Sequence, residues 1–121
     1  MSLVLVIDDD MAMRVLMARL VEAAGHNAVL AEGGDEGLEA FARLAPDLVI
    51  TDLSMPEGGG GDLIAEIRRL APDAKILAVS GRFTGAEPDP AGMRDAFAVD
   101  AVLGKPFRAR EFCAAVDGLL A

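Results

Sequence analysis

The sequence contains no Trp, no Tyr and only one Cys, and no apolar run is long enough to span a bilayer. A single cysteine excludes an internal disulfide and a cluster of cysteine metal ligands, and it favours a reducing cytoplasm. No signal peptide is visible, because the first residues lack a charged segment, an apolar segment and a cleavage site. With five Phe as the only aromatic residues, a buried core must be mainly aliphatic.

Positive charge is also scarce, since 11 Lys and Arg face 20 Asp and Glu and the formal net charge is −9. Such a surface repels phosphate backbones and anionic membranes, so we expect neither direct nucleic-acid binding nor membrane binding. The chain has 121 residues, which suits one domain with a core of its own. We therefore expect a single cytoplasmic domain over residues 1–121.

Short apolar runs alternate with segments of helical period along the chain. The runs of strand length are Leu3–Ile7, Ala28–Ala31, Leu48–Thr51, Ile76–Val79 and Ala101–Leu103. The helical segments are Met11–Ala24, Asp35–Leu44, Asp62–Leu70, a short one near Ala91–Ala98, and Arg108–Leu120. Continuous apolar strands are covered on both faces, and the alternation requires parallel strands with right-handed crossovers. The pattern predicts an α/β fold with a doubly wound, five-stranded parallel sheet.

Several single residues are predicted to mark helix ends or packing. Gly25 follows the first helix as its C′ residue, and Asp35 is the expected N-cap of the second. The run Gly58–Gly61 indicates a flexible loop before the third helix. His26, the only histidine, has no visible partner and is expected at the surface. Cys113 and the methionines of the first helix are expected to pack in the core.

Polar side chains follow four of the five predicted strands. In chain order they are Asp8, Asp9 and Asp10 after the first strand, Asp52 after the third, Ser80 after the fourth and Lys105 after the fifth. In an open parallel sheet, ligands bind at the carboxyl ends of the strands, where the strand order reverses. If the order is 2-1-3-4-5, these four endings lie side by side on one rim of the sheet.

The charges on that rim indicate a phosphoryl-transfer site. Asp8, Asp9 and Asp52 cannot all ionise comfortably at close range unless a divalent cation joins them. Oxygen ligands suit Mg²⁺ better than zinc, and Lys105 and Ser80 can contact phosphoryl oxygens. Asp52, on the central strand, is then the candidate nucleophile. Each residue alone has an ordinary explanation as a cap, a turn residue or a solvated lysine, but their joint placement favours a site.

Four stretches carry this pattern: Val4–Asp10, Pro46–Pro56, Ala78–Gly81 and Lys105–Phe107. In their order and spacing, the chain resembles the receiver domains of bacterial response regulators, the chemotaxis regulators included, over essentially its whole length. The resemblance implies a flavodoxin-like (βα)5 sandwich with strand order 2-1-3-4-5. It also implies a switch in a two-component phosphorelay, which assists its own phosphorylation and dephosphorylation but is not an enzyme acting on other substrates.

The resemblance implies a phosphoacceptor and a Mg²⁺ site. Asp52 would accept a phosphoryl group from the phosphohistidine of a sensor histidine kinase or a histidine phosphotransfer protein. Asp9, Asp52 and the backbone carbonyl of Ser54 would ligate Mg²⁺ directly, and Asp8 would act largely through water.

The resemblance further implies that Ser80 and Lys105 contact the phosphoryl group and that the Lys105–Pro106 peptide bond is cis. Phosphorylation would then change a surface recognised by a downstream protein. Since no output domain follows Ala121 in the sequence, we expect protein contact or phosphoryl relay as the output.

Three positions depart from the family pattern. Val102 stands three residues before the lysine, where receivers usually carry an aromatic residue, and a valine cannot make the aromatic swing that often reports phosphorylation. The segment Ser80–Lys105 is a few residues longer than usual and rich in Gly and Pro. Gly59 replaces a common aspartate. The first two departures affect the output mechanism rather than phosphoryl acceptance.

Two other functions fit parts of the sequence. Asp8 and Asp10 form an Asp-x-Asp after an apolar strand, as in aspartate-nucleophile phosphatases, but that interpretation leaves Asp52 without a role. A flavin-binding module shares the expected topology, but the loops lack a Ser/Thr-rich phosphate cradle and aromatic residues to hold a flavin.

Overall fold

The structure is a computed structural model that describes residues 2–53, 60–81 and 98–121. Its strands are β1 (Leu3–Ile7), β2 (Asn27–Ala31), β3 (Leu48–Asp52), β4 (Ile76–Ser80) and β5 (Ala101–Gly104). Its helices are α1 (Met11–Ala23), α2 (Gly34–Leu44), α3 (Gly60–Leu70) and α5 (Ala109–Leu120). The short helix expected near residues 91–98 lies, except for Ala98, outside the described residues, as do Gly59 and most of the long segment before β5.

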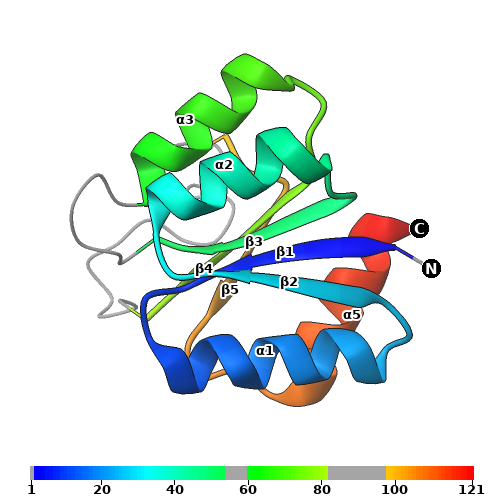
Figure 1. Cartoon of the computed structure of the whole chain (residues 1–121). Helices are drawn as coiled ribbons and strands as arrows, with labels where there is room; N and C mark the ends of the chain where they lie inside the picture. The colour runs from blue at the N-terminus through cyan, green and yellow to red at the C-terminus, as the bar shows by residue number, and fades with distance from the viewer. Residues whose placement is uncertain (1, 54–59, 82–97) are drawn as a thin grey trace.

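The strands form one parallel sheet in the order β2-β1-β3-β4-β5. Helices α2 and α3 cover one face of the sheet, and α1 and α5 cover the other (Figure 1). The predicted doubly wound, flavodoxin-like arrangement is therefore confirmed. The two chain ends lie together at the edge where the strands begin, so the carboxyl ends of the strands form the opposite edge (Figure 1).

Successive strand residues point to opposite faces of the sheet, and this alternation builds two separate cores. The α1/α5 cluster lies on one face and comprises Val4, Val6, Met17, Val21, Leu48, Ile50, Leu77, Val79, Phe112 and Val116, with Leu103 among the partly buried residues packed against it. The α2/α3 cluster on the other face includes Leu5, Ile7, Val49, Ile76 and Ala78 from the strands. Both faces are buried, which explains why the strands are apolar at consecutive positions.

Helix α1 begins and ends with specific caps. The Asp10 carboxylate accepts hydrogen bonds from two backbone N–H groups of the first turn, at 2.9 and 3.3 Å. At the other end, Gly25 has a φ of +94° and its N–H donates to the Glu22 carbonyl, while the His26 N–H donates to the Val21 carbonyl. This is a Schellman motif, and it confirms Gly25 as the C′ residue.

Three local predictions are wrong. The N-cap of α2 is Gly33, and Asp35 lies in the first turn, where its charge still favours the positive end of the helix. Helix α3 begins at Gly60, so half of the run Gly58–Gly61 is helical; glycine is tolerated there because the first N–H groups have no intrahelical partner. Met11 is 69% exposed, since the buried stripe of α1 begins one turn later.

The expectation that His26 has no partner is also wrong. Its Nε2 lies 3.3 Å from Oδ1 of Asp117 on α5, and its side chain is only 16% exposed. The two residues are 91 positions apart, so only the fold brings them together. Cys113 is partly buried against the α1/α5 cluster, as expected for a packing residue.

Helix α2 approaches the end of β1 closely at Gly37. A Cβ atom on Gly37 would lie 2.6 Å from Cδ1 and 3.0 Å from Cγ1 of Ile7. Ile7 is fully buried and cannot swing into solvent to make room. Glycine therefore sets the distance between α2 and the strand that leads directly to Asp8.

We expect Gly37→Ala to destabilise the fold by about 1–3 kcal/mol, because overpacking outweighs the roughly 1 kcal/mol gained in helix propensity. The matched control is Gly118→Ala in α5, where nothing lies within 4 Å of the new Cβ and a small gain in stability is expected. Urea unfolding followed by circular dichroism measures both variants. Ile7→Val, which removes Cδ1, should restore part of the loss, and equal effects of the two glycine substitutions would contradict the close-approach argument.

Candidate functional site

The alternation of strand side chains brings three polar residues to one place. Asp8, Asp52 and Lys105 each stand two positions after a residue that packs in or against the α1/α5 cluster, namely Val6, Ile50 and Leu103. Positions two apart share a face of the sheet, and the three strands lie within four consecutive parallel strands, β1-β3-β4-β5. The same periodicity that builds the core therefore directs these side chains toward one another where the strands end.

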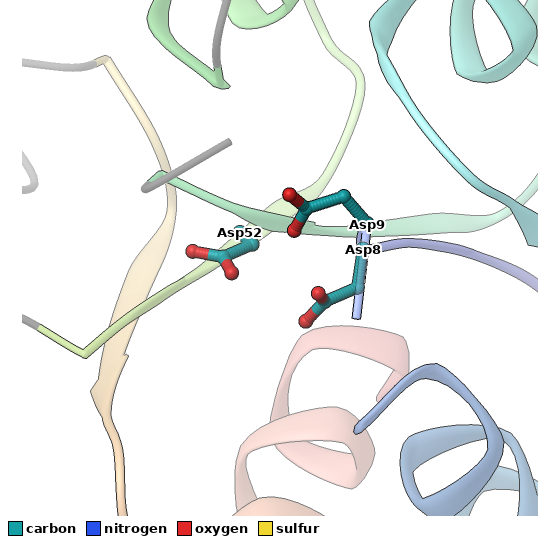
Figure 2. Close-up of side chains that lie close together, drawn as sticks. All are labelled: Asp8, Asp9 and Asp52. Atoms are coloured by element: carbon teal, nitrogen blue, oxygen red, sulfur yellow. The ribbon is translucent and has the colours of Figure 1, made fainter. Parts of the chain in front are cut away.

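Asp9, the residue after Asp8, joins Asp8 and Asp52 in a cluster of three acids. Each offers a carboxylate oxygen, and these oxygens all lie within 4.8 Å of one another. Figure 2 shows the three carboxylates around a common space where β1 and β3 end. Asp8 and Asp52 are buried, whereas Asp9 is exposed to solvent. The structure thus brings together the acids that the sequence analysis placed on one rim.

Lys105 joins the two buried acids. Its Nζ donates to Oδ2 of Asp52 at 2.9 Å and to Oδ2 of Asp8 at 3.1 Å. The lysine side chain is 18% exposed, so these are mostly desolvated ion pairs. The peptide bond from Lys105 to Pro106 is cis, as the family resemblance implied.

Of the two serines expected at the site, the structure describes Ser80. Ser80 is the last residue of β4, is 3% exposed and lies opposite Gly104 of β5. Its carbonyl accepts a hydrogen bond of 2.8 Å from the Lys105 N–H, so the fourth and fifth strand endings are adjacent. Ser54 lies outside the described residues.

Burial and neighbouring charges shift the pKa values of Asp8 and Lys105 in opposite directions. Burial raises the pKa of Asp8 above its ordinary 3.8, although hydrogen bonds from the Asp10 N–H and from Lys105 partly oppose the change. For Lys105, burial alone would lower the pKa, but the hydrogen bonds and charges of Asp52 and Asp8 outweigh it and the pKa is raised. At Lys105 the ion pairs outweigh burial, because the lysine faces two acids and keeps some solvent contact. At Asp8 burial outweighs the hydrogen bonds, because its side chain is fully buried.

The chemistry of these donors fits a hard divalent cation. All three are carboxylates, and oxygen ligands are those that Mg²⁺ prefers. A dication among them would relieve the repulsion between charges that Lys105 balances only in part.

Arg14 is the residue near the cluster that the sequence analysis missed. It is 8% exposed, and its Nη1 donates to the backbone carbonyl of Asp8 at 2.7 Å. Helical period could have identified it, since Arg14, Met17, Ala18 and Val21 form the buried stripe of α1. A charged residue inside an apolar stripe indicates a specific buried partner.

The fold and the rim together define a doubly wound α/β protein whose acidic, oxygen-only cluster lies where the strand order reverses. The chain belongs to the response regulator receiver domain family, which matches residues 4–117. The family acts in two-component signalling, and the regulatory class predicted from the sequence is therefore confirmed.

Individual relatives agree with this assignment. The chain is similar to the chemotaxis protein CheY of Thermotoga maritima, with 40% identity over 64% of this chain and 65% of that protein. It is also similar to the response regulator MprA of Mycobacterium sp. (strain KMS), with 36% identity over 97% of this chain and 50% of that protein. The chain therefore spans about half the length of the MprA relatives it matches.

A solved receiver domain supports the fold. The response regulator receiver domain protein of Clostridium thermocellum has a TM-score of 0.88 and 27% identity, covering 99% of this chain and 94% of that one. Within the described part of the chain, no helix has the length and apolar character required to span a bilayer.

We expect Asp8→Asn to stabilise the metal-free protein near neutral pH by on the order of 1 kcal/mol, a typical size for one substitution. Because the folded pKa of Asp8 lies above its ordinary value of 3.8, ionised Asp8 opposes folding, and stability falls as the pH rises through that interval. The advantage of the variant should therefore vanish below pH 3.8, where Asp8 is protonated in both states.

Urea unfolding in the presence of EDTA, repeated across this pH range, measures the effect. Asp73→Asn, at an exposed acid, is the control and should change little. If Asp8→Asn instead lowered the stability of the metal-free protein, the hydrogen bonds to Asp8 would have to outweigh its burial.

Proposed function

We propose that this chain is one receiver domain, over residues 1–121, in which Asp52 accepts a phosphoryl group from a phosphohistidine on a partner protein. The observation that carries the proposal is the Lys105–Asp52 contact of 2.9 Å beside two further acids. It combines a positioned nucleophile, an ammonium for a phosphoryl oxygen and a donor set for Mg²⁺ in one small volume.

In the proposed reaction, an Asp52 oxygen attacks phosphorus in line with the leaving nitrogen. A P–O bond to Asp52 forms while the P–N bond to the partner's imidazole breaks, and the leaving nitrogen takes up a proton. Lys105, held beside the nucleophile, neutralises one phosphoryl oxygen, and Ser80 donates a hydrogen bond to another. Water later attacks the phosphorus of the acyl phosphate, the P–O bond to Asp52 breaks and inorganic phosphate leaves, which restores the carboxylate with the assistance of the same groups.

The proposed Mg²⁺ ligands are Asp9, Asp52 and the Ser54 carbonyl, and Asp8 acts through water. The two Asp8 oxygens support the last assignment, because one accepts the Asp10 N–H at 2.9 Å and the other accepts Lys105 at 3.1 Å. Asp9 is exposed and points at the same space. When bound, the ion neutralises charge that develops on the transferred phosphoryl group.

The phosphatase alternative is less well supported. It requires Asp10, the second acid of the Asp-x-Asp, to act at the reacting centre. Instead, Oδ1 of Asp10 accepts two hydrogen bonds from the first turn of α1, and this contact fixes the start of the helix. Family membership also favours the signalling function over the flavin-binding one.

Incubation with Mg²⁺ and a small phosphodonor such as acetyl phosphate, followed by intact-mass measurement, tests the proposal. We expect one labile phosphoryl group on the wild type and none on Asp52→Asn, because the amide is not a nucleophile for this transfer. Asp117→Asn is a control that changes an exposed acid of α5. Labelling that persists in Asp52→Asn but disappears in Asp8→Asn would instead indicate a phosphatase-type nucleophile.

A phosphohistidine-bearing partner must dock beside the acids, and the exposed face of α1 fits this role. Met11, Val15 and Leu16 are 69%, 38% and 46% exposed, and the first turn of α1 carries no acidic side chain. Exposed apolar side chains on a chain of net charge −9 are a favourable contact for an apolar helix of a kinase or phosphotransfer protein. We extend the proposal to a downstream protein target and to a cytoplasmic location, which the single cysteine favours.

We expect Leu16→Glu to slow phosphoryl transfer from a histidine-phosphorylated donor protein by about tenfold, the equivalent of roughly 1.4 kcal/mol of docking energy. The rate with acetyl phosphate should not change, because this donor needs no protein contact. The matched control is Leu70→Glu, at a 54% exposed leucine of α3. Equal slowing with both donors would mean that the substitution disturbs the site rather than docking.

A further inference from the structure

Arg14 is a buried charge that the proposed reaction does not use. It is 8% exposed and lies on the same stripe of α1 as Met17 and Val21, both of which are fully buried. Burying a guanidinium is unfavourable unless it is paired and hydrogen-bonded. Its position must therefore be explained by its contacts.

Two contacts of Arg14 differ in strength. Nη1 donates to the Asp8 carbonyl at 2.7 Å, a short, charge-assisted and buried hydrogen bond. Nη2 lies 3.6 Å from Oε1 of Glu32, whose side chain is 73% exposed. A long pair with an exposed carboxylate contributes little. The Asp8 carbonyl is therefore the main partner of the guanidinium.

That carbonyl has a special place in the site. It belongs to the peptide group that joins Asp8 to Asp9, and it lies just past the last paired residue of β1, Ile7. Because a peptide group is planar, fixing its oxygen also fixes the direction of the Asp9 N–H and Cα. The N–H of Asp8 is held separately, by the Ala31 carbonyl at 3.2 Å.

We propose that Arg14 is a positioning residue for the metal site: by holding the Asp8–Asp9 peptide plane, it aims the exposed carboxylate of Asp9 at Asp52. The proposal deepens the function proposed above and rests on its Mg²⁺ site. The carboxylate of Asp8 has its own anchors in Lys105 and the Asp10 N–H, whereas the carbonyl of the peptide group that leads to Asp9 is held by Arg14.

The direction in which Mg²⁺ affinity changes on replacing Arg14 distinguishes a positioning role from a purely electrostatic one. Arg14 is a cation, so its charge alone opposes the binding of Mg²⁺ nearby, and a neutral replacement would then bind Mg²⁺ more tightly. If Arg14 positions Asp9, the same replacement binds Mg²⁺ more weakly, because the ligands must be ordered at the moment of binding. Groups that orient metal ligands typically change affinity by about 10- to 100-fold.

Isothermal titration of Mg²⁺ into the wild type and Arg14→Met tests this. We expect about tenfold weaker binding in Arg14→Met and an intermediate affinity in Arg14→Lys, which keeps the charge and one donor group. Arg19→Met removes an exposed cation of the same helix, and Val21→Ala weakens the core of α1 far from Asp9. Both controls should stay within about twofold of the wild type, which separates positioning from a general loss of stability.

Each outcome decides a specific point. Unchanged or tighter Mg²⁺ binding by Arg14→Met, with normal binding by the wild type, overturns the role of Arg14 and leaves the proposed function intact. A wild type that binds no Mg²⁺ overturns both. If Arg14→Met does not fold by circular dichroism, Arg14→Lys alone decides, and an affinity equal to that of the wild type overturns the proposal.

Discussion

Lys105 reaches across the sheet edge to Asp8 and Asp52 with hydrogen bonds of 3.1 and 2.9 Å, and the arrangement of the site depends on this contact. Two buried carboxylates at this range repel each other, and the hydrogen-bonded lysine ammonium offsets that repulsion. One positive charge does not balance the three carboxylates of Asp8, Asp9 and Asp52. Burial adds to the cost of ionising Asp8, whose pKa it raises. In the proposed function, this excess of negative charge attracts a dication and, with it, the electrophilic phosphorus of the phosphodonor.

The sheet produces this cluster through its alternation rather than through any one loop. Val6, Ile50 and Leu103 pack in or against the α1/α5 cluster, and two positions after them stand Asp8, Asp52 and Lys105. A shift of one residue in strand register would turn the strand's side chains to the other face and disperse the acids. The close approach of α2 at Gly37 and the buried Arg14 act on the same strand ending, from the two opposite faces of the sheet. Packing and polar contacts thus hold the end of β1, where two of the three acids stand, from both faces of the sheet.

The periodic features of this chain were predictable, and its pairwise contacts were not. The short apolar runs predicted each strand to within one residue at either end, and the polar residues after those runs predicted the acids of the cluster. Both are properties of consecutive residues. The cap of α2 was misplaced by two residues because both Gly33 and Asp35 are acceptable at a helix start. The contacts of His26 with Asp117 and of Gly37 with Ile7 need the relative placement of distant elements, which no local pattern contains. Arg14 was visible as a polar residue in an apolar stripe, but only the fold shows that its partner is a backbone carbonyl.

Val102 limits the ways in which a displacement of Lys105 can be transmitted to the rest of the protein. It is half-buried on β5, packs against the α2/α3 cluster and stands opposite Ala78 of β4. A β-branched side chain has one torsion with few allowed states, so it cannot move between distinct buried and exposed positions as a large aromatic ring can. Strand β5 is the outermost strand beside β4, and its residues are all half-buried, so it is held less firmly than the central strands. In the proposed switch, a phosphoryl group on Asp52 takes over the ammonium of Lys105. The resulting displacement is therefore transmitted by the backbone of β5 rather than by a side-chain rotation.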